Sequence, residues 1–417
     1  DAGSTDMGPY YHGSATPFLP RATYKHDLAI MLKAARQARI PLLVGSVLTS
    51  GCDSTLETGL EIIREIAKEE GLSFRMAAIR AEIPKAELKR RMASETFESL
   101  GPEGPLTDEI IDRCGPISAQ MGTEPFVRAL DAGAEVIIAG RACDDAVFAA
   151  MPMLKGFDTG LALHCGKILE CAGLSAIPYD LAEPMLGTIG RDDFVVEPAN
   201  AKHRCTMVSV AGHSLYERGD FEFQPGPGGM NDLSQAVFEQ LDDRRVRVRG
   251  SRFVPDGHYR VKLEGAERVG FRSIVVVGIR DPIMIRELDP LLAETEARAE
   301  ARFGMRANGI SLTFRVYGRD AVMGRLEPGG AAPREVGLVI DAVAPTQDQA
   351  TAVAMYSRGH LQHASYPGIL TTAGNMAYPF SPFGIPVGPA CRFAVYHLMS
   401  LKDPCEIFPM TIEEVRH

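Results

Sequence analysis

Apolar positions recur with a helical period in some segments of the chain and with a strand-like pattern in others. Leu28, Leu32 and Ala35 lie on one face of a helix expected from 26 to 38, and the apolar run 41–47 predicts a buried strand. Helices and strands then alternate with short connections, which favours right-handed crossovers and a mainly parallel sheet. The other elements predicted in this half are helices at 54–71, 85–92, 124–132, 142–153 and 160–172, and strands at 74–79 and 135–140.

After about residue 187, the pattern changes to short strands separated by turn residues. The segments 245–249, 259–263 and 273–277 alternate with period two or are rich in β-branched residues, as strands are. Two helices are expected among them, one near 288–303 and one after the capping pattern that begins at Thr346.

Length and composition agree with two hydrophobic cores. A chain of 417 residues, 45% of them hydrophobic, exceeds the roughly 250 to 300 residues at which a single core stops growing. We therefore predict an α/β fold in which residues 1–186 form a mainly parallel sheet flanked by helices and residues 187–417 form a separate α+β domain. Because the chain opens on a polar loop that reads as the continuation of a strand, we also expect an N-terminal strand to precede Asp1.

Charge and cysteine content disfavour several classes of function. The net charge is -10, with 44 basic residues dispersed among 54 acidic ones, so no concentrated positive surface is expected for nucleic acid. No apolar run approaches the roughly 20 residues that span a membrane. Eight cysteines without a CxxC pair indicate a reducing cytoplasm. The sequence patterns of dinucleotide folds, phosphate loops, zinc proteases and serine-hydrolase elbows are missing, which disfavours a dehydrogenase or a kinase.

Ligands of open parallel sheets bind beyond the carboxyl ends of the strands, and the loop 1–13 is predicted to occupy such a position. It places hydroxyls and carboxylates among glycines. Asp6 is a candidate catalytic residue, because a carboxylate here can accept a substrate proton or bind a divalent metal such as Mg²⁺. Ser4, Thr5 and Tyr10 are candidate substrate-binding residues. The alternative is a turn that satisfies its own backbone.

A second polar segment, residues 45–54, leads from a predicted strand into a predicted helix. Exposed N–H groups at a helix start attract a carboxylate or a phosphate, so Ser46 and Ser54 are candidate substrate-binding residues. Ser54 also opens a capping box that ends at Glu57. Asp53 is a candidate catalytic residue, and its alternative role is a second cap for the same helix.

A third polar segment follows the predicted strand 135–140. Arg141 can hold a carboxylate with two parallel hydrogen bonds, and Asp144 can orient Arg141 or transfer a proton. A structural Arg–Asp pair at a helix entry is the alternative. We expect the three segments to converge on one water-poor cavity that binds a small anionic substrate.

Two further candidates for proton transfer lie outside these segments. Lys167 has apolar neighbours in the predicted helix 160–172, and burial can convert a lysine into a base, although a solvated lysine is the common alternative. His213, three residues before Tyr216, is a candidate acid or base.

The irregular stretch 366–383 combines glycines, prolines, aromatics and hydroxyls and is too apolar for disorder. It predicts a wall of the active site or a subunit contact, in agreement with a homo-oligomer. Thr372 and Asn375 within it are candidate substrate-binding residues.

Eight segments, in the same order along the chain, resemble the AtuA-like (acyclic terpene utilisation) family. The most distinctive are Asp-x-Gly-Ser-Thr-Asp-x-Gly-Pro-Tyr-Tyr-x-Gly at 1–13 and Glu-Pro-Phe with Gly-Arg-x-x-Asp at 124–144. The resemblance implies metabolism near acyl-CoA or branched carboxylic acid breakdown, often with a small companion protein, and a strand and helix before the first loop. It implies no particular reaction. The other segments are 167–171, 192–198, 250–255, 315–319, 343–347 and 372–382.

The leading hypothesis for function is a lyase or hydro-lyase acting on a small hydroxy or amino acid. Arg141 and the helix start at Ser54 would hold the carboxylate, and a basic residue or Mg²⁺ would stabilise the enolate-like state. The proton would be moved by Asp6, Asp53, Lys167 or His213. The first alternative is a hydratase or transferase of branched acyl-CoA, weakly suggested by the arginines 244, 245, 247 and 249. The second is a non-catalytic scaffold subunit of a two-component enzyme.

Overall fold

The computed structural model describes the chain apart from residues 1, 96, 103, 181, 331 and 372. It contains two compact units, the first formed by Asp1–Glu267 with Phe393–His417 and the second by Arg268–Arg392. The α/β class with a mainly parallel sheet and an additional α+β unit is confirmed. The units do not part between 186 and 187, where the sequence analysis placed the domain boundary. Strand β7 (Met185–Ile189) continues across that position.

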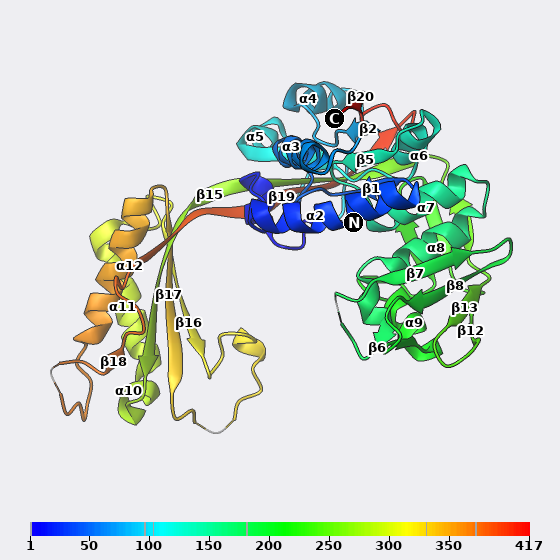
Figure 1. Ribbon diagram of the computed structural model, residues 1–417. Helices are drawn as coiled ribbons and strands as arrows, with labels where there is room; N and C mark the ends of the chain where they lie inside the picture. Colours follow the sequence, from blue (N-terminus) through cyan, green and yellow to red (C-terminus); the bar gives the residue numbers. More distant parts are fainter. Residues whose placement is uncertain (1, 96, 103, 181, 331, 372) are drawn as a thin grey trace. The chain divides into compact units, whose positions relative to one another are not determined.

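The central sheet of the first unit has the strand order β1-β5-β2-β20 (Figure 1). Strands β1 (Leu42–Val44), β5 (Val136–Ala139) and β2 (Phe74–Ile79) run parallel, whereas β20 (Met410–Val415) pairs antiparallel with β2. The short βα connections therefore give the parallel order that the sequence predicted.

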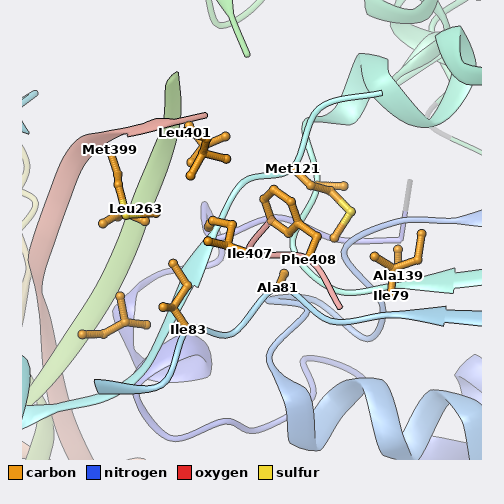
Figure 2. Packing of buried hydrophobic residues seen from close by; sticks show 14 of the residues in the cluster. Ile79, Ala81, Ile83, Met121, Ala139, Leu263, Met399, Leu401, Ile407 and Phe408 are labelled. Carbon is orange, nitrogen blue, oxygen red and sulfur yellow. The ribbon is translucent and has the colours of Figure 1, made fainter. Parts of the chain in front are cut away.

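Helices cover this sheet with the apolar faces that the sequence indicated. Helix α3 (Asp53–Glu70) buries Leu56, Leu60, Ile63 and Ala67 in one hydrophobic cluster with α2 (Arg21–Ala38) and β1. A second cluster joins β2, β5 and α6 (Glu124–Asp131) with residues of the C-terminal segment. Figure 2 shows that side chains from distant parts of the sequence, among them Ile79, Leu263 and Phe408, belong to this second cluster.

A smaller antiparallel layer completes the first unit. Its sheet has the order β12-β13-β8-β7, and helix α8 (Thr159–Leu169) packs Leu161, Cys165 and Ile168 into the same cluster as Phe194 and Val248 of this sheet. Helix α7 (Asp144–Leu154) contacts α8 extensively. The other strands of this layer are β8 (Asp193–Pro198), β12 (Val237–Gln240) and β13 (Val246–Arg249), and the neighbouring three-stranded sheet contains β10 (Phe223–Gly226), β11 (Gly229–Asp232) and β14 (Arg252–Pro255).

One long strand replaces two predicted ones. Strand β15 runs without interruption from Tyr259 to Ile279, whereas the sequence suggested separate strands at 259–263 and 273–277. Its first part pairs with β4 (Cys114–Ala119), with an irregularity between Gly265 and Glu267. Strand β19 (Ile385–Leu401) is similarly long. Both strands contain residues of both units.

The second unit is an antiparallel sheet packed against helices. β16 (Ser311–Tyr317) and β17 (Val336–Ala344) pair with each other, and β17 pairs with the later part of β15. Alternate residues of β15, including Val275 and Val277, are buried in one cluster with α11 (Leu288–Phe303) and α12 (Gln347–Gln362). The predicted cap is confirmed, because the Thr346 side chain accepts a hydrogen bond from the Gln349 N–H at 3.2 Å.

The remaining elements are short. No helix among the described residues is long and apolar enough to cross a membrane. The short elements are α1 (Pro9–Gly13), α4 (Lys85–Met92), α5 (Asp108–Arg113), α9 (Met207–Ser214), α10 (Pro282–Arg286), the 3-10 helices η1 (Ala172–Ser175) and η2 (Gly324–Leu326), and the strands β3 (Glu98–Ser99), β6 (Ala176–Ile177), β9 (Arg204–Cys205) and β18 (Met376–Ala377).

Candidate functional site

The first unit contains a cavity of about 630 Å³, a size in the range of small-molecule sites. Its walls come from the N-terminal loop, the starts of α7 and β15, the end of α8, the segment after α9, the β10–β11 turn and β19. The parallel sheet contributes the carboxyl end of β5, where ligands of such sheets bind. Charged side chains dominate two opposite parts of the lining, and each part is built around one basic residue.

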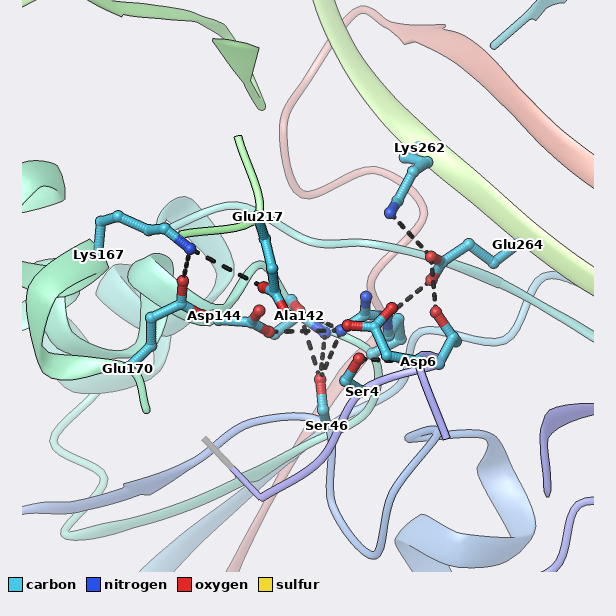
Figure 3. Close-up of polar contacts among 12 residues, drawn as sticks. Ser4, Asp6, Ser46, Ala142, Asp144, Lys167, Glu170, Glu217, Lys262 and Glu264 are labelled. Carbon is cyan, nitrogen blue, oxygen red and sulfur yellow. Dashed lines mark hydrogen bonds and ion pairs between the residues drawn. The ribbon is translucent and has the colours of Figure 1, made fainter. Parts of the chain in front are cut away.

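The first part is centred on a buried ion pair between Arg141 and Glu264. Glu264 and its neighbour Lys262 are labelled in Figure 3. Arg141 Nε donates to Glu264 Oε2 at 2.7 Å, and both side chains are only 3% exposed. Glu264 Oε1 accepts a hydrogen bond from Thr5 Oγ1 at 2.9 Å and lies 2.9 Å from Lys262 Nζ. Although burial opposes the charge, Arg141 and Lys262 hold the pKa of Glu264 well below its usual range. This carboxylate is therefore ionised and fully paired.

Close backbone packing at the end of β5 fixes the position of Arg141. The Arg141 N–H donates to the Gly51 carbonyl oxygen at 3.0 Å. A Cβ on Gly51 would lie 2.4 Å from that nitrogen, so only glycine fits there. Ser46 Oγ, which is buried, accepts hydrogen bonds from Arg141 Nη1 and from the Ala142 N–H, each at 3.2 Å. The turns at 46, 51 and 141 thus converge and hold the guanidinium in place.

The second part is a group of three carboxyl side chains around Lys167 (Figure 3). Oxygen atoms of Asp144, Glu170 and Glu217 all lie within 4.8 Å of one another. Lys167 Nζ hydrogen-bonds to Glu170 Oε1 and is 3.9 Å from Glu217 Oε2. Asp144, the first residue of α7, also lies 3.5 Å from Arg141 Nη1, so it links the two parts of the lining.

Glu170 is the group whose charge this arrangement disfavours most. Burial and the neighbouring Asp144 raise its pKa to about 8, and Lys167 offsets only part of that rise. Because Glu170 is a residue of α8's C-terminal end and is only 4% exposed, water cannot stabilise its carboxylate. The raised pKa favours the protonated form of Glu170, and a protonated carboxyl beside other carboxyl groups suits general acid and general base catalysis.

Aromatic side chains support Lys167 from behind. Its Nζ lies 5.1 Å from the centroid of the Tyr216 ring, a cation–π contact. His213 stacks on the same ring with centroids 5.3 Å apart, and its Nε2 donates to the Glu170 carbonyl oxygen at 2.8 Å. Burial lowers the pKa of His213, so the neutral imidazole is favoured. His213 is not among the residues that line the cavity, and its ring supports the Glu170 backbone; a catalytic role for it stays a prediction.

A divalent cation would find oxygen ligands in Asp144, Glu170 and Glu217, the type of ligand that Mg²⁺ prefers. The ammonium of Lys167 already lies among these carboxyl groups. An ion and this ammonium would therefore compete for the same oxygens. Asp6, the predicted metal ligand, belongs to the lining but not to this group.

The structure brings five of the predicted site residues to the cavity wall: Ser4, Asp6, Arg141, Asp144 and Lys167. Thr5 and Ser46 lie directly behind it, bound to Glu264 and Arg141. The turns after the predicted strands therefore converge in part, as expected from the shared edge of a parallel sheet. The sequence predicted that Arg141 holds a substrate carboxylate. In the structure its guanidinium donates to Glu264, Ser46 and the Ala142 carbonyl oxygen, and the predicted role stays untested.

Three predicted site residues lie away from the cavity. Asp53 Oδ2 is 3.0 Å from Arg80 Nη1 in a partly exposed pair. The capping box predicted at Ser54 is wrong, since α3 begins one residue earlier with Cys52 as its N-cap, and Ser54 Oγ donates to the Ala15 carbonyl oxygen at 3.3 Å. Tyr10 is part of α1, and its ring contacts Tyr11 edge to face.

The stretch 366–383 belongs to the second unit. Asn375 Nδ2 donates to Asp281 Oδ2 at 3.3 Å and also contacts Tyr366 Oη. Tyr366 Oη donates to the same carboxylate oxygen at 2.6 Å, so these three side chains tie the stretch to the start of α10. Thr372 lies outside the described residues.

Sequence reasoning did not select the residues that complete the two parts of the lining. Glu170 lies in the same predicted helix as Lys167, and Glu217 directly follows Tyr216. The spacing of three between Lys167 and Glu170 is a usable signal, since residues three apart on a helix lie on one side. Lys262 and Glu264 are spaced like alternating strand residues, and nothing local indicates that Glu264 pairs with Arg141.

Comparison with known proteins identifies one family. A family model described as acyclic terpene utilisation family protein AtuA matches residues 22–381 of the chain. No curated protein and no solved structure matches it.

Proposed function

Because the chain belongs to the acyclic terpene utilisation (AtuA) family, we propose that it is a metabolic enzyme, specifically a lyase that removes or adds water or ammonia next to the carboxylate of a small acid. The observation that supports this most is the cluster of three carboxyl side chains, Asp144, Glu170 and Glu217, around Lys167. Glu170 has a pKa of about 8 and is protonated at neutral pH, while Asp144 and Glu217 offer carboxylate oxygens within 4.8 Å. An elimination uses a general base that removes a proton and a general acid that protonates the leaving group.

The proposed reaction assigns one step to each group. Asp144 or Glu217 takes the proton from the carbon beside the substrate carboxylate, and the electron pair left on that carbon forms the double bond. The bond from the adjacent carbon to oxygen or nitrogen breaks, and Glu170 gives its proton to the departing hydroxide or amine. The ammonium of Lys262, in the opposite part of the lining, stabilises the negative charge that develops on the substrate carboxylate during proton removal. Hydration or amination is the reverse sequence.

The opposite part of the lining offers a site for the substrate carboxylate. Lys262 Nζ lies 2.9 Å from Glu264 and 5.3 Å from the centroid of the Tyr396 ring, and its side chain is 23% exposed. A carboxylate bound there would face an ammonium held in position on two sides. Arg141 contributes indirectly, because it fixes Glu264 and lies within 3.5 Å of Asp144.

The test is an assay of the purified protein against small hydroxy and amino acids, alone and together with the product of its genomic neighbour, monitored by the absorbance of a conjugated double bond. Glu170→Gln keeps the shape of the protonated carboxyl, but an amide cannot give a proton to the leaving group. We therefore expect a rate loss of about 10²- to 10⁴-fold. Glu413→Gln is the matched control, because Glu413 is a surface residue paired with Arg64. The proposal would be contradicted if Glu170→Gln had the activity of the wild type, or if the wild type converted none of the acids tested.

A hydratase or transferase of branched acyl-CoA is the second candidate. The cavity is larger than a small acid requires, and Leu100, Tyr396 and Leu398 add apolar surface beside Arg260 and Lys262. The four arginines between 244 and 249 do not support it, since none of them lines the cavity and Arg245 and Arg247 pair with nearby carboxylates. A rise in melting temperature with coenzyme A, and none with small acids, would favour this candidate.

The scaffold alternative makes a different prediction from both enzymes. If the chain only stabilises a partner subunit, the partner alone should be fully active, and Arg141→Ala and Asp6→Asn should leave the activity of the pair unchanged. If the chain carries the catalytic carboxyl groups, Glu170→Gln should inactivate the pair while the two proteins still co-purify. The two readouts, activity and co-purification, therefore separate the alternatives.

A further inference from the structure

The sheet of the second unit ends in an exposed strand. Within the described part of the chain, β16 lies at the end of the order β16-β17-β15-β19 and pairs with β17 alone (Figure 1). The backbone groups on the free side of such a strand pair readily with another strand, and natural edge strands usually prevent this with proline, lysine or a bulge. β16 contains neither proline nor lysine, and its register with β17 is uninterrupted from 311 to 317.

The two faces of β16 differ in character. Leu312, Phe314 and Val316 are covered wholly or in part and belong to the hydrophobic cluster under the helices. On the other face, Ser311, Thr313, Arg315 and Tyr317 are exposed. The strand is therefore amphipathic, and any strand added to it must present apolar side chains on the helix side and polar ones on the other.

Exposed apolar side chains continue directly after β16. Val322, Met323 and Leu326 are 83%, 50% and 78% exposed, and Tyr317 at the end of the strand is 48% exposed. Large apolar side chains gathered at one place on a surface mark interaction sites. The free edge of β16 and the segment 317–326 together form one candidate interface, which we call the β16 edge.

We propose that the β16 edge is a dimer interface, at which the β16 strands of two copies of this chain pair antiparallel around a twofold axis at Phe314. In this register Leu312 lies opposite the partner's Val316, Thr313 opposite the partner's Arg315, and Ser311 opposite the partner's Tyr317. The sheets of the two copies then form one continuous sheet, with α11 and α12 of both copies on the same side.

Self-complementarity of the strand favours a second copy over a foreign strand. Read in either direction from Phe314, β16 has the same order of apolar and polar residues. Arg315 is its only charged residue, and it lies 3.4 Å from Asp341 on β17. In the proposed register, Arg315 faces the partner's Thr313. The residue paired with that threonine on β17 is the partner's Asp341. Moving the axis to Arg315 would place two arginines opposite each other, which is unfavourable.

Cysteine pairs test the register. In a Ser311→Cys/Tyr317→Cys double variant, each new thiol faces one of the partner's, and directly opposed residues have the Cα separation that a disulfide requires. We expect a covalent dimer on mild oxidation, with residues 311 and 317 joined in the cross-linked peptide. Each single variant is a matched control, because identical residues would lie about 20 Å apart, six residues along the strand. The single variants should stay monomeric on a denaturing gel.

A lysine at the edge tests whether the interface forms at all. Thr313→Lys places a charge at the centre of the interface, so we expect sedimentation to show loss of the dimer with an unchanged melting transition of the monomer. Thr411→Lys is the control, since Thr411 is also an exposed threonine on an edge strand, β20. A wild-type chain that is monomeric at every concentration overturns the proposal. A dimer that survives Thr313→Lys and gives no cross-link in the double variant overturns it as well, and places the contact elsewhere.

Discussion

Two basic residues of the cavity lining, Arg141 and Lys167, are equally buried but differ in how their charges are balanced. Arg141 shares Glu264 with Lys262, so two cations surround one carboxylate and the pKa of Glu264 falls. Lys167 faces three carboxyl groups, and the pKa of Glu170 rises to about 8. Burial is the same in both places, so the number of opposing charges decides the outcome. The first arrangement suits a fixed support, and the second suits proton transfer.

The largest effect is expected from breaking the fixed support. Glu264→Gln leaves Arg141 buried without its counter-charge, so we expect the free energy of unfolding to fall by about 3–5 kcal/mol in urea denaturation at neutral pH. Glu413→Gln, which breaks an ion pair that is about 40% exposed on both sides, should cost less than about 1 kcal/mol. A small loss for Glu264→Gln would mean that Arg141 is not held in the way that the buried pair indicates.

The pH dependence of this loss has a definite sign. Because the pKa of Glu264 is depressed in the folded state, its contribution to stability is present above the usual value of 4.5 and is lost as the pH falls below it. The difference between wild type and Glu264→Gln should therefore be constant near neutral pH and should shrink in acid.

The sequence predicted the parallel sheet, the helix order and the loop that contributes Ser4 and Asp6, because these depend on local periodicity and on the shared edge of the strands. It did not predict the Arg141–Glu264 pair. Residues 263 to 267 of β15 are all buried, so the alternation that identifies a strand disappears there, and the strand was expected to end. The partner of Glu264 lies 123 residues away, and no local pattern encodes such a pairing.

The second largest effect is expected from Glu170 and should appear as a change in pH dependence. Between about pH 4.5 and 8 the folded state keeps a proton on Glu170 that the unfolded state has lost, so wild-type stability falls as the pH rises through this window. Glu170→Gln cannot titrate and should lack this fall. Its stability relative to wild type should therefore increase with pH, by about 1.4 kcal/mol for each unit of raised pKa.

Urea denaturation across this pH range measures the effect, and Glu413→Gln again serves as the control because no buried carboxyl is removed. Parallel pH profiles for wild type and Glu170→Gln would show that Glu170 is ionised in the folded protein. That outcome would also remove the general acid from the proposed reaction. Glu170 and Glu264 would then both be ionised, and the two parts of the cavity would not differ in protonation.

A smaller effect is expected from Lys167, whose ammonium occupies the space among three carboxyl groups. In Lys167→Ala this space is open to Mg²⁺ or Mn²⁺, and binding to the folded state raises the melting temperature. At an ion concentration ten times the dissociation constant, the gain is about 1.4 kcal/mol, or about 2–4 °C for a domain of this size. Lys262→Ala is the matched control, since it removes an ammonium from the other part of the cavity.

The change in the melting temperature of the wild type with the ion shows whether the three carboxyl side chains bind a metal or only the Lys167 ammonium. An equal rise in wild type and Lys167→Ala would show that the ion binds despite the ammonium, so a divalent metal would belong to the native site. No rise in Lys167→Ala would show that Asp144, Glu170 and Glu217 do not act together as ligands.

The smallest effect is expected at Asp53, which the sequence could not distinguish from Asp144. Each is the first residue of a helix that follows a parallel strand, α3 for Asp53 and α7 for Asp144. Each therefore gains a similar stabilisation, about 0.3–1 kcal/mol, from the helix dipole. What differs is the tertiary environment, since Asp53 pairs with Arg80 at the surface and Asp144 contacts Arg141 at the cavity.

Asparagine at both positions isolates that difference. Asp53→Asn should cost less than about 1 kcal/mol and leave the pH dependence of stability as in the wild type. Asp144→Asn removes the same helix-dipole interaction, but it also removes the charge that raises the pKa of Glu170. The decline of stability should therefore begin near pH 4.5 in both proteins, but it should end at a lower pH and have a smaller total size in Asp144→Asn. If stability depends on pH in the same way in the two variants, the charge of Asp144 does not raise the pKa of Glu170, although the two side chains lie close together in the cavity.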